Sequence, residues 1–231
     1  MENSTEFLTF FKEHVLSKEK NQALYIEKVK AAFMCSRAPN IIWTYFDLET
    51  SNSESTDVNI RNGTIIEIGA VHGEKVFSQL CNPGHSITNS HIHNIKDTDV
   101  SDKNSTEKVL GDFLAWSQSL KESDDDIVVL IAHNAANFDK KVLVNHIRKY
   151  KIVKDLDGIV IADSLYPIKG LVESKQAKLE IVYKELFTQE YIEKHRALDD
   201  SKDLMRIIEH LSSVKKKSLF EMLSNYMYLL H

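Results

Sequence analysis

The segment Ile41–Thr50 limits the possible folds of this chain more than any other. It is a run of apolar, β-branched and aromatic residues that ends in two carboxylates, Asp47 and Glu49. Such a run is typical of a buried strand, in which side chains i and i+2 point to the same face. Two carboxylates side by side there repel each other and are costly to desolvate, and a divalent cation would offset that cost. The tripeptide Asp47-Leu48-Glu49 is of a common kind, and a strand that simply ends in a polar loop would also explain it. Residues elsewhere in the chain are needed to distinguish a metal site from such a loop.

The composition is that of an ordinary globular protein. The chain has 231 residues, of which 42% are hydrophobic and 27% charged, enough for one well-buried core with an appendage. It contains no apolar run of membrane-span length and no recognisable secretory leader. Cys35 and Cys81 are its two cysteines, so a disulfide framework is not expected. We therefore predict an intracellular protein of the cytoplasm or nucleus.

The formal net charge of −5 is unevenly distributed. Residues 1–40 and 212–231 each have a small positive excess, so residues 41–211 are more acidic than the whole chain. An acidic body argues against a protein that coats polyanions through a basic surface. It does not exclude a nucleic-acid enzyme that carries its positive charge as bound metal ions.

The hydrophobic pattern divides the chain into three parts. Residues 1–40 have apolar residues at helical spacing and end near Pro39, which predicts an N-terminal helical extension. Residues 41–211 form the main domain. Residues 212–231 are expected to be a C-terminal helical tail, with a last short helix over 218–230.

The main domain is predicted to contain five strands and four helices. The strands are expected at 41–48, 64–71, 75–81, 127–132 and 159–161, and the helices at 105–120, 139–150, 174–188 and 199–212. A hairpin followed by strands that alternate with helices predicts an α/β fold with a mixed five-stranded sheet flanked by helices. Ligands in such sheets bind beyond the carboxyl ends of strands, where Asp47 and Glu49 lie.

Two aspartates further along the chain fall on the buried sides of predicted helices. Asp139 opens the helix after the fourth strand and lies four residues before inward-facing Leu143. Aspartate is also common near a helix start because it stabilises the macrodipole. Asp200 lies four residues before inward-facing Leu204, whereas adjacent Asp199 falls on the polar face and is expected to cap the helix.

His195 stands just before this last helix and completes a set of four carboxylates and one histidine. If clustered, these groups would bind two hard cations through oxygen and leave a base whose pKa lies near neutrality. Such a set is suited to phosphodiester hydrolysis by two metal ions about 3.5–4 Å apart. His91 and His93 could form half of a zinc site, but a surface loop is the better interpretation.

Three segments have the order and spacing of a known family. They are Asp47-Leu48-Glu49-Thr50, His133-Asn134-x-x-x-Phe138-Asp139 and His195-x-Ala197-x-x-Asp200. They resemble the exonuclease motifs of the DEDD family, histidine subtype, which includes DnaQ-like proofreading enzymes, ribonuclease T and the animal three-prime repair exonucleases. The resemblance covers residues 41–211 and implies an exonuclease domain with a ribonuclease H-like fold. The three residues between Asn134 and Phe138 are closer to the repair type, and a glycine common after the first motif is missing.

The resemblance implies a 3′–5′ exonuclease of single-stranded DNA or RNA that releases nucleoside monophosphates. It implies two Mg²⁺ or Mn²⁺ ions per site. Asp47 would bridge both ions, and Glu49 and Asp200 would complete the shell of the tighter one. Asp139 would hold the second ion, and His195 would be the general base for the attacking water.

The resemblance also suggests substrate contacts. Ile92 would be an apolar wedge against the terminal base, although anchoring of its loop in the core is an equally good interpretation. Further contacts are expected from Leu48, Thr50, His133 and Asn134. Repair-type enzymes are dimers, so a homodimer is expected by resemblance alone.

Three other functions fit the same residues less well. A catalytically silent nuclease-fold module that binds nucleic acid or a protein would usually have lost a carboxylate or the histidine, and all five are present. A phosphatase with an aspartyl nucleophile would have Asp-x-Asp followed by Gly-Thr, which Asp47-Leu48-Glu49 lacks. A DEDD enzyme with a tyrosine base would not have His195 at that place.

Overall fold

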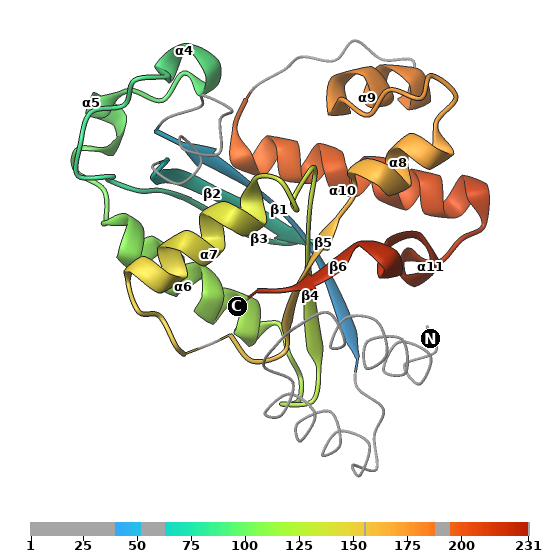
Figure 1. Ribbon diagram of the computed structural model, residues 1–231, viewed down its shortest axis with the longest axis horizontal. Coiled ribbons are helices and arrows are strands. Elements are labelled where there is room, and N and C mark those ends of the chain that lie inside the picture. The colour runs from blue at the N-terminus through green and yellow to red at the C-terminus, as the bar shows by residue number, and fades with distance from the viewer. Residues whose placement is uncertain (1–39, 52–62, 155, 188–194, 231) are drawn as a thin grey trace.

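The computed structural model describes residues 40–51, 63–154, 156–187 and 195–230. Their centre is a six-stranded mixed sheet with the strand order β3-β2-β1-β4-β5-β6 (Figure 1). The strands are β1 Ile41–Thr50, β2 Ile65–His72, β3 Lys75–Leu80, β4 Ile127–Ala132, β5 Ile159–Asp163 and β6 Met227–Leu229. The helices predicted within residues 1–40 lie outside the described residues.

The central strands are parallel and share one carboxyl edge. β1 runs parallel to β4, with Tyr45 opposite Ile131, and β4 runs parallel to β5, with Ala132 opposite Asp163. β2 pairs with β1, and β3 with β2, in the antiparallel sense. The end of β1 that carries the two carboxylates therefore lies level with the loops that follow β4 and β5.

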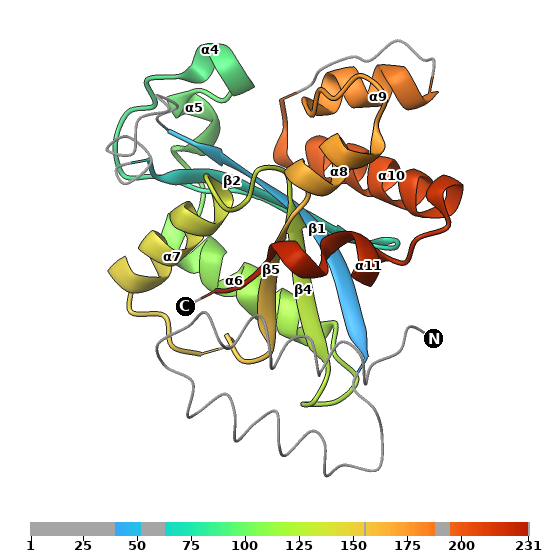
Figure 2. The same ribbon diagram turned by 45° about the vertical axis from the view of Figure 1, so that its right-hand side comes forward.

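Helices cover both faces of the sheet. They are α4 Ser90–His93, α5 Asp97–Val100, α6 Thr106–Ser119, α7 Asp139–Lys149, α8 Leu165–Leu171, α9 Leu179–Phe187, α10 Ala197–Lys215 and α11 Leu219–Leu223. α6 and α7 pack on one face and α8, α9 and α10 on the other (Figures 1 and 2). β4 is buried on both sides, because alternate residues such as Val129 and Leu130 belong to different core clusters. No helix among the described residues is long and apolar enough to cross a membrane.

The predicted fold class, an α/β fold with a mixed sheet flanked by helices, is confirmed, but the sheet has six strands instead of five. The prediction of one helix over 218–230 is wrong at its end, because α11 stops at Leu223 and β6 pairs with β5. Met227 and Leu229 of β6 fill one core cluster, and this burial overrides the local pattern.

The sequence pattern does not predict α8. Pro167 and Gly170 within it are poor helix formers, which hid the helix from the pattern. Proline is nevertheless tolerated in a first turn, where its missing N–H would have no partner in the helix.

Candidate active site

Three carboxylates meet at the carboxyl end of β1. Asp47, Glu49 and Asp200 each offer an oxygen, and these atoms lie within 4.8 Å of one another. Asp47 and Glu49 share a face of β1 because they are two residues apart in a strand. Asp200 comes from the first turn of α10, whose buried stripe of Leu204, Ile207, Ile208 and Leu211 turns that face toward the sheet. The helical phase predicted for Asp200 is therefore the observed one.

β2 holds the start of α10 against the carboxylate-bearing strand. Gly69 lies opposite Asp47 in the sheet and in direct contact with α10, because a Cβ built on it would lie 2.1 Å from the Leu198 nitrogen. The Ser201 hydroxyl donates a hydrogen bond of 3.0 Å to the Gly69 carbonyl. Only glycine permits this approach of helix to strand, so Gly69 determines how near Asp200 lies to Asp47.

The negative charge of Glu67 on β2 also holds the first turn of α10 in place. Glu67 is 1% exposed, and its carboxylate accepts hydrogen bonds from Nε and Nη2 of Arg196, the latter at 2.6 Å. It also accepts the Ala197 N–H at 3.1 Å, the first amide of α10. The first amide of α10 is thus capped by a side chain of β2. The prediction that Asp199 caps the helix is wrong, because Arg196 occupies the N-cap position.

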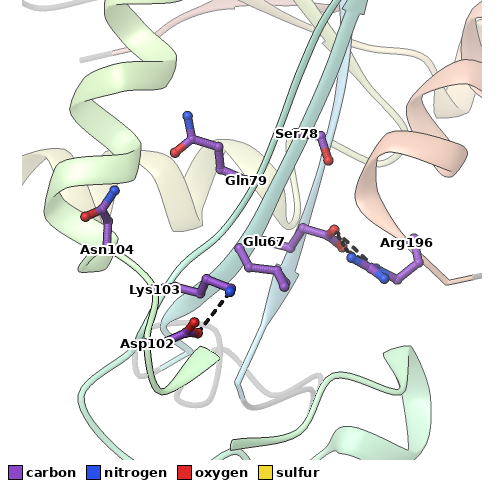
Figure 3. Close-up of a pocket in the computed structure, with 8 residues that line it drawn as sticks. Glu67, Ser78, Gln79, Asp102, Lys103, Asn104 and Arg196 are labelled. Carbon is purple, nitrogen blue, oxygen red and sulfur yellow. Dashed lines mark hydrogen bonds and ion pairs between the residues drawn. The ribbon is translucent and has the colours of Figure 1, made fainter. Parts of the chain in front are cut away.

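Figure 3 shows this ion pair in the wall of a pocket of about 420 Å³. The Glu67 carboxylate and the Arg196 guanidinium face each other there, and a Lys103–Asp102 ion pair of 2.9 Å lies on another wall. None of the three clustered carboxylates lines the pocket. The pair therefore links this neighbouring hollow to the carboxylate site without being part of the cluster.

Asp139 approaches the site from α7. Its side chain is 1% exposed, and its Oδ1 has no hydrogen-bond partner among the described residues. The loop that leads to it is anchored by buried Asp163 of β5, which accepts the Ala136 N–H at 2.9 Å. Asp139 is among the charges that raise the pKa of Asp47, which places the two carboxylates within electrostatic range.

Burial and mutual repulsion change the ionisation of these groups. Burial raises the pKa of Asp47 well above its usual range, and Asp139, Glu49 and Asp200 raise it further. Burial, with added repulsion from Asp200 and Glu67, raises the pKa of Glu49 to about 9. Burial, with a smaller effect of Asp163, raises the pKa of Asp139 to about 8. Near neutral pH these carboxyl groups need a nearby cation in order to ionise together.

The residues present fit a divalent metal ion. The donor set consists of carboxylate oxygens, which magnesium and manganese prefer. The buried Asp139 Oδ1 without a protein partner is an atom that a cation or its water would satisfy. Asp47, Glu49 and Asp200 would hold such an ion, and Asp139 would reach it or a second one.

This arrangement predicts that stability depends on both pH and metal. The carboxyl pKa values are raised from about 4 in the unfolded chain to about 8 and 9 for Asp139 and Glu49. The unfolded chain then binds fewer protons between these limits, so stability without metal should fall as pH rises through them. Added Mg²⁺ or Mn²⁺ should raise the melting temperature by about 5–10 °C at roughly 100 times its Kd.

Differential scanning fluorimetry in EDTA and in metal, at about pH 5.5 and about pH 8.5, checks this prediction. The metal-induced rise should be larger at the higher pH, and Asp47→Asn should reduce it. Asp124→Asn, which changes an exposed carboxylate outside the site, should leave it unchanged. Equal metal effects at both pH values would contradict the assigned carboxyl pKa shifts.

His195 immediately precedes the N-cap of α10 and is not part of the carboxylate cluster. It precedes the N-cap Arg196 with a positive φ of 45°, an uncommon conformation for a residue with a side chain. Its charge influences the pKa of His93 on α4 and of Glu180 on α9, so it lies within electrostatic range of both. The ion pair between Glu67 and Arg196 holds Arg196, the residue that follows His195, in place.

The predicted substrate contacts differ in their exposure. Ile92 is half-exposed on α4, which is tied to the end of β1 by a 2.8 Å hydrogen bond from the Asn89 amide to the Thr50 carbonyl. Leu48 is 4% exposed within the core, and Thr50 is 4% exposed. Their side chains are therefore buried, and contact of either residue with a substrate stays a prediction.

The other two predicted contacts stand in the loop after β4. His133 shares a 3.0 Å hydrogen bond with Ser164, and Asn134 has a positive φ of 63° and accepts a hydrogen bond from Asn137. Both residues are half-exposed at the carboxyl edge of the sheet. Their contact with a substrate stays a prediction.

Sequence reasoning missed the residues that position the cluster, Glu67, Gly69 and Arg196. The signal that could have found them is an acidic residue and a glycine inside the apolar strand segment Ile65–Val71. A charge in a buried strand needs a partner, but the sequence does not show that the partner is 129 residues away.

The strand order and the carboxylate cluster define a ribonuclease H-like fold with an acidic site suited to metal ions. A family model described as RNase_T, Exonuclease, matches residues 44–208. The chain belongs to this exonuclease family, and the resemblance to DEDD exonucleases recognised from the motifs is confirmed.

A curated relative agrees with this assignment. The chain is 32% identical over 188 residues to "Exonuclease DPD1, chloroplastic/mitochondrial" of Arabidopsis thaliana. The match covers 74% of this chain but 58% of that protein, so the chain spans less than two thirds of its relative.

Solved structures share the fold. A 3′-exonuclease in a structure of 3′-end-specific recognition of histone mRNA stem-loop has a TM-score of 0.61 at 16% identity, over 91% of this chain and 81% of that one. The nuclease domain of 3′hExo, a DEDDh family member bound to rAMP, has a TM-score of 0.57 at 18% identity, over 75% and 92%. The E. coli ExoI–ssDNA complex has a TM-score of 0.55 at 15% identity, over 75% and 41%.

Proposed function

We propose that this chain is a metal-dependent 3′–5′ exonuclease that hydrolyses the terminal phosphodiester of single-stranded DNA or RNA and releases nucleoside monophosphates. The observation that carries the proposal is the convergence of Asp47, Glu49 and Asp200 within 4.8 Å on a fold of the exonuclease family. Structures of the same fold include a 3′-exonuclease and complexes with ssDNA and rAMP, which supports a nucleic-acid 3′ end as substrate.

Each residue has a defined task in this proposal. Two Mg²⁺ or Mn²⁺ ions, when bound, would activate the attacking water and stabilise charge on the phosphate and the leaving oxygen. Asp47, Glu49 and Asp200 would hold one ion, and Asp139, together with Asp47, would hold the second. His195 accepts the proton of the attacking water, and its half-exposed position leaves it able to return that proton to solvent.

Residues around the carboxylate cluster orient the 3′ end of the nucleic-acid strand. Ile92 packs against the terminal base from α4, and the main chain of Leu48 and Thr50 contacts the terminal nucleotide. His133 and Asn134 contact the phosphate backbone from the loop after β4, where they are half-exposed. The terminal nucleotide thus lies toward α4, and the rest of the nucleic-acid strand lies toward the loop after β4.

End-labelled oligonucleotides test this proposal. Single strands of DNA and RNA with one sequence are incubated with Mg²⁺ or Mn²⁺. A 3′ label should be released at once as a mononucleotide, whereas a 5′ label should give a ladder of shortening products. Asp47→Asn and His195→Ala should abolish both patterns, and Asp124→Asn should not. Equal residual activity of the wild type and the site variants would overturn the proposal in favour of a catalytically silent binding module.

The location and assembly of the chain stay predictions. The plant relative is named as chloroplastic and mitochondrial, whereas we predicted cytoplasm or nucleus for this chain. A homodimer is proposed by resemblance alone, and light scattering of the full chain at several concentrations would test it.

A further inference from the structure

Three tyrosines lie near the outer strand β6, on the side of the sheet opposite to β3. This tyrosine surface consists of Tyr166 at the start of α8, Tyr226 just before β6, and Tyr228 within β6. The rings of Tyr166 and Tyr226 are stacked, with centroids 5.9 Å apart and planes 15° apart. The ammonium of Lys140 on α7 lies 4.7 Å from the centre of the Tyr228 ring. A positive charge therefore accompanies the aromatic rings.

The tyrosine surface lies at the same edge of the sheet as the carboxylate cluster. Tyr166 follows β5 by three residues, and Tyr226 precedes Met227, which is opposite Ala162 near the carboxyl end of β5. Figure 1 shows α8 next to the carboxyl end of β5. Across this edge the order is β1 with the cluster, β4 with His133 and Asn134, β5, and then β6. Lys140 is also the residue next to Asp139.

Exposure distinguishes this surface from a core contact. Tyr166 is 52% exposed, and it is one of four exposed large hydrophobic residues among the described ones. Tyr226 and Tyr228 are half-exposed. Burial raises the pKa of the Tyr228 phenol, and Asp163, Tyr166 and Tyr226 add to this effect, so these polar groups lie within electrostatic range of one another. The surface thus combines one exposed aromatic ring, that of Tyr166, with the hydroxyl groups of three tyrosines.

We propose that the tyrosine surface binds the nucleotides on the 5′ side of a single strand whose 3′ end lies at the carboxylate cluster. This inference rests on the proposed exonuclease function and extends it to a substrate track. Bases of any sequence stack on aromatic rings, and a nearby lysine attracts the phosphate backbone. The surface is continuous with the site through His133, which bonds to Ser164, two residues before Tyr166.

The dimensions of the sheet set the length of strand that can reach this surface. Neighbouring strands are about 4.8 Å apart, so β5 and β6 lie about 10–14 Å from β1 along the edge. A dinucleotide bound at the cluster is too short to reach Tyr166, whereas a strand of several nucleotides can. The tyrosine surface should therefore affect long substrates and leave the shortest one unchanged.

Substrate length separates a binding surface from a structural role. The measurement is kcat/KM on a thymidine dinucleotide and on a dodecanucleotide for the wild-type chain, Tyr166→Ala and Tyr166→Phe. Tyr166→Ala should lower the value for the dodecanucleotide about tenfold, chiefly through KM, and change the dinucleotide value less than about twofold. Tyr166→Phe keeps the ring and should remain near wild type on both. Val153→Ala, which truncates an 82% exposed side chain elsewhere, is the matched control.

Binding without hydrolysis gives an independent result. With Ca²⁺ in place of Mg²⁺, the anisotropy of a labelled dodecanucleotide should show a Kd about tenfold weaker for Tyr166→Ala. Unchanged dodecanucleotide binding and hydrolysis, or an equal loss on both substrate lengths, would overturn the inference while leaving the exonuclease proposal intact. If the wild-type chain binds the strand through Tyr166 but hydrolyses nothing, the exonuclease proposal fails and the binding surface stands. Unchanged binding and hydrolysis of the dodecanucleotide is also the result expected if the tyrosine surface binds a protein partner instead.

Discussion

Replacing Asp47 with asparagine should lower kcat on a single-stranded oligonucleotide by about a thousandfold or more, with little change in fold. The asparagine has the same shape, so the packing of β1 is kept. It removes one negative charge from the centre of the cluster, where Asp47 lies within 4.8 Å of Glu49 and Asp200. An amide oxygen holds a divalent cation less strongly than a carboxylate does. The same change relieves repulsion, so the melting temperature without metal should rise.

This combination of results is specific to a metal-binding carboxylate. Single-turnover hydrolysis with Mn²⁺ measures the rate, and calorimetric titration with Mn²⁺ measures the affinity. Asp124→Asn controls for loss of a negative charge at an exposed position outside the site. If Asp47→Asn kept more than about a tenth of the wild-type rate, with metal affinity unchanged, the assignment of Asp47 as the bridging ligand would be wrong.

Adding a single methyl group at Gly69 should damage the site almost as severely. A Cβ there would lie 2.1 Å from the Leu198 nitrogen and 2.2 Å from the Ala197 carbonyl carbon. Normal contacts between such atoms are about 3.5–4 Å, so α10 must move away from β2 by more than about 1 Å. Asp200 and His195 would move with it, and misplacement of this size can reduce a rate about a hundredfold. Overpacking should also cost about 1–3 kcal/mol of stability.

A second glycine offers the matched control for this change. Gly111 lies within α6, and a Cβ built on it meets nothing within 4 Å. Gly111→Ala should therefore leave the rate unchanged and stabilise the helix by about 0.5–1 kcal/mol. Urea unfolding gives the two stabilities, and oligonucleotide hydrolysis gives the two rates. A wild-type rate in folded Gly69→Ala would show that the contact between α10 and β2 does not position the site.

Much of the fold could be predicted from local pattern. The apolar strand Ile127–Ala132 has the bounds expected of it, and the hairpin of β2 and β3 was recognised from its turn. Periodicity also gave the buried sides of the helices that start near Asp139 and Asp200. α8 and β6 escaped detection because Pro167 and Gly170 obscure a short helix and because pairing with β5, a nonlocal interaction, decides the state of Met227–Leu229.

The sequence by itself determined which chemical groups are available: two carboxylates on one strand face, two aspartates on buried helix faces, and a histidine before the last of these helices. These follow from periodicity, which is local. Only the tertiary structure decided how close the groups lie, because distance depends on contacts between remote segments. Gly69 and Glu67 on β2 hold α10 within reach of Asp47, and the register of β1, β4, β5 and β6 aligns the cluster with the tyrosine surface.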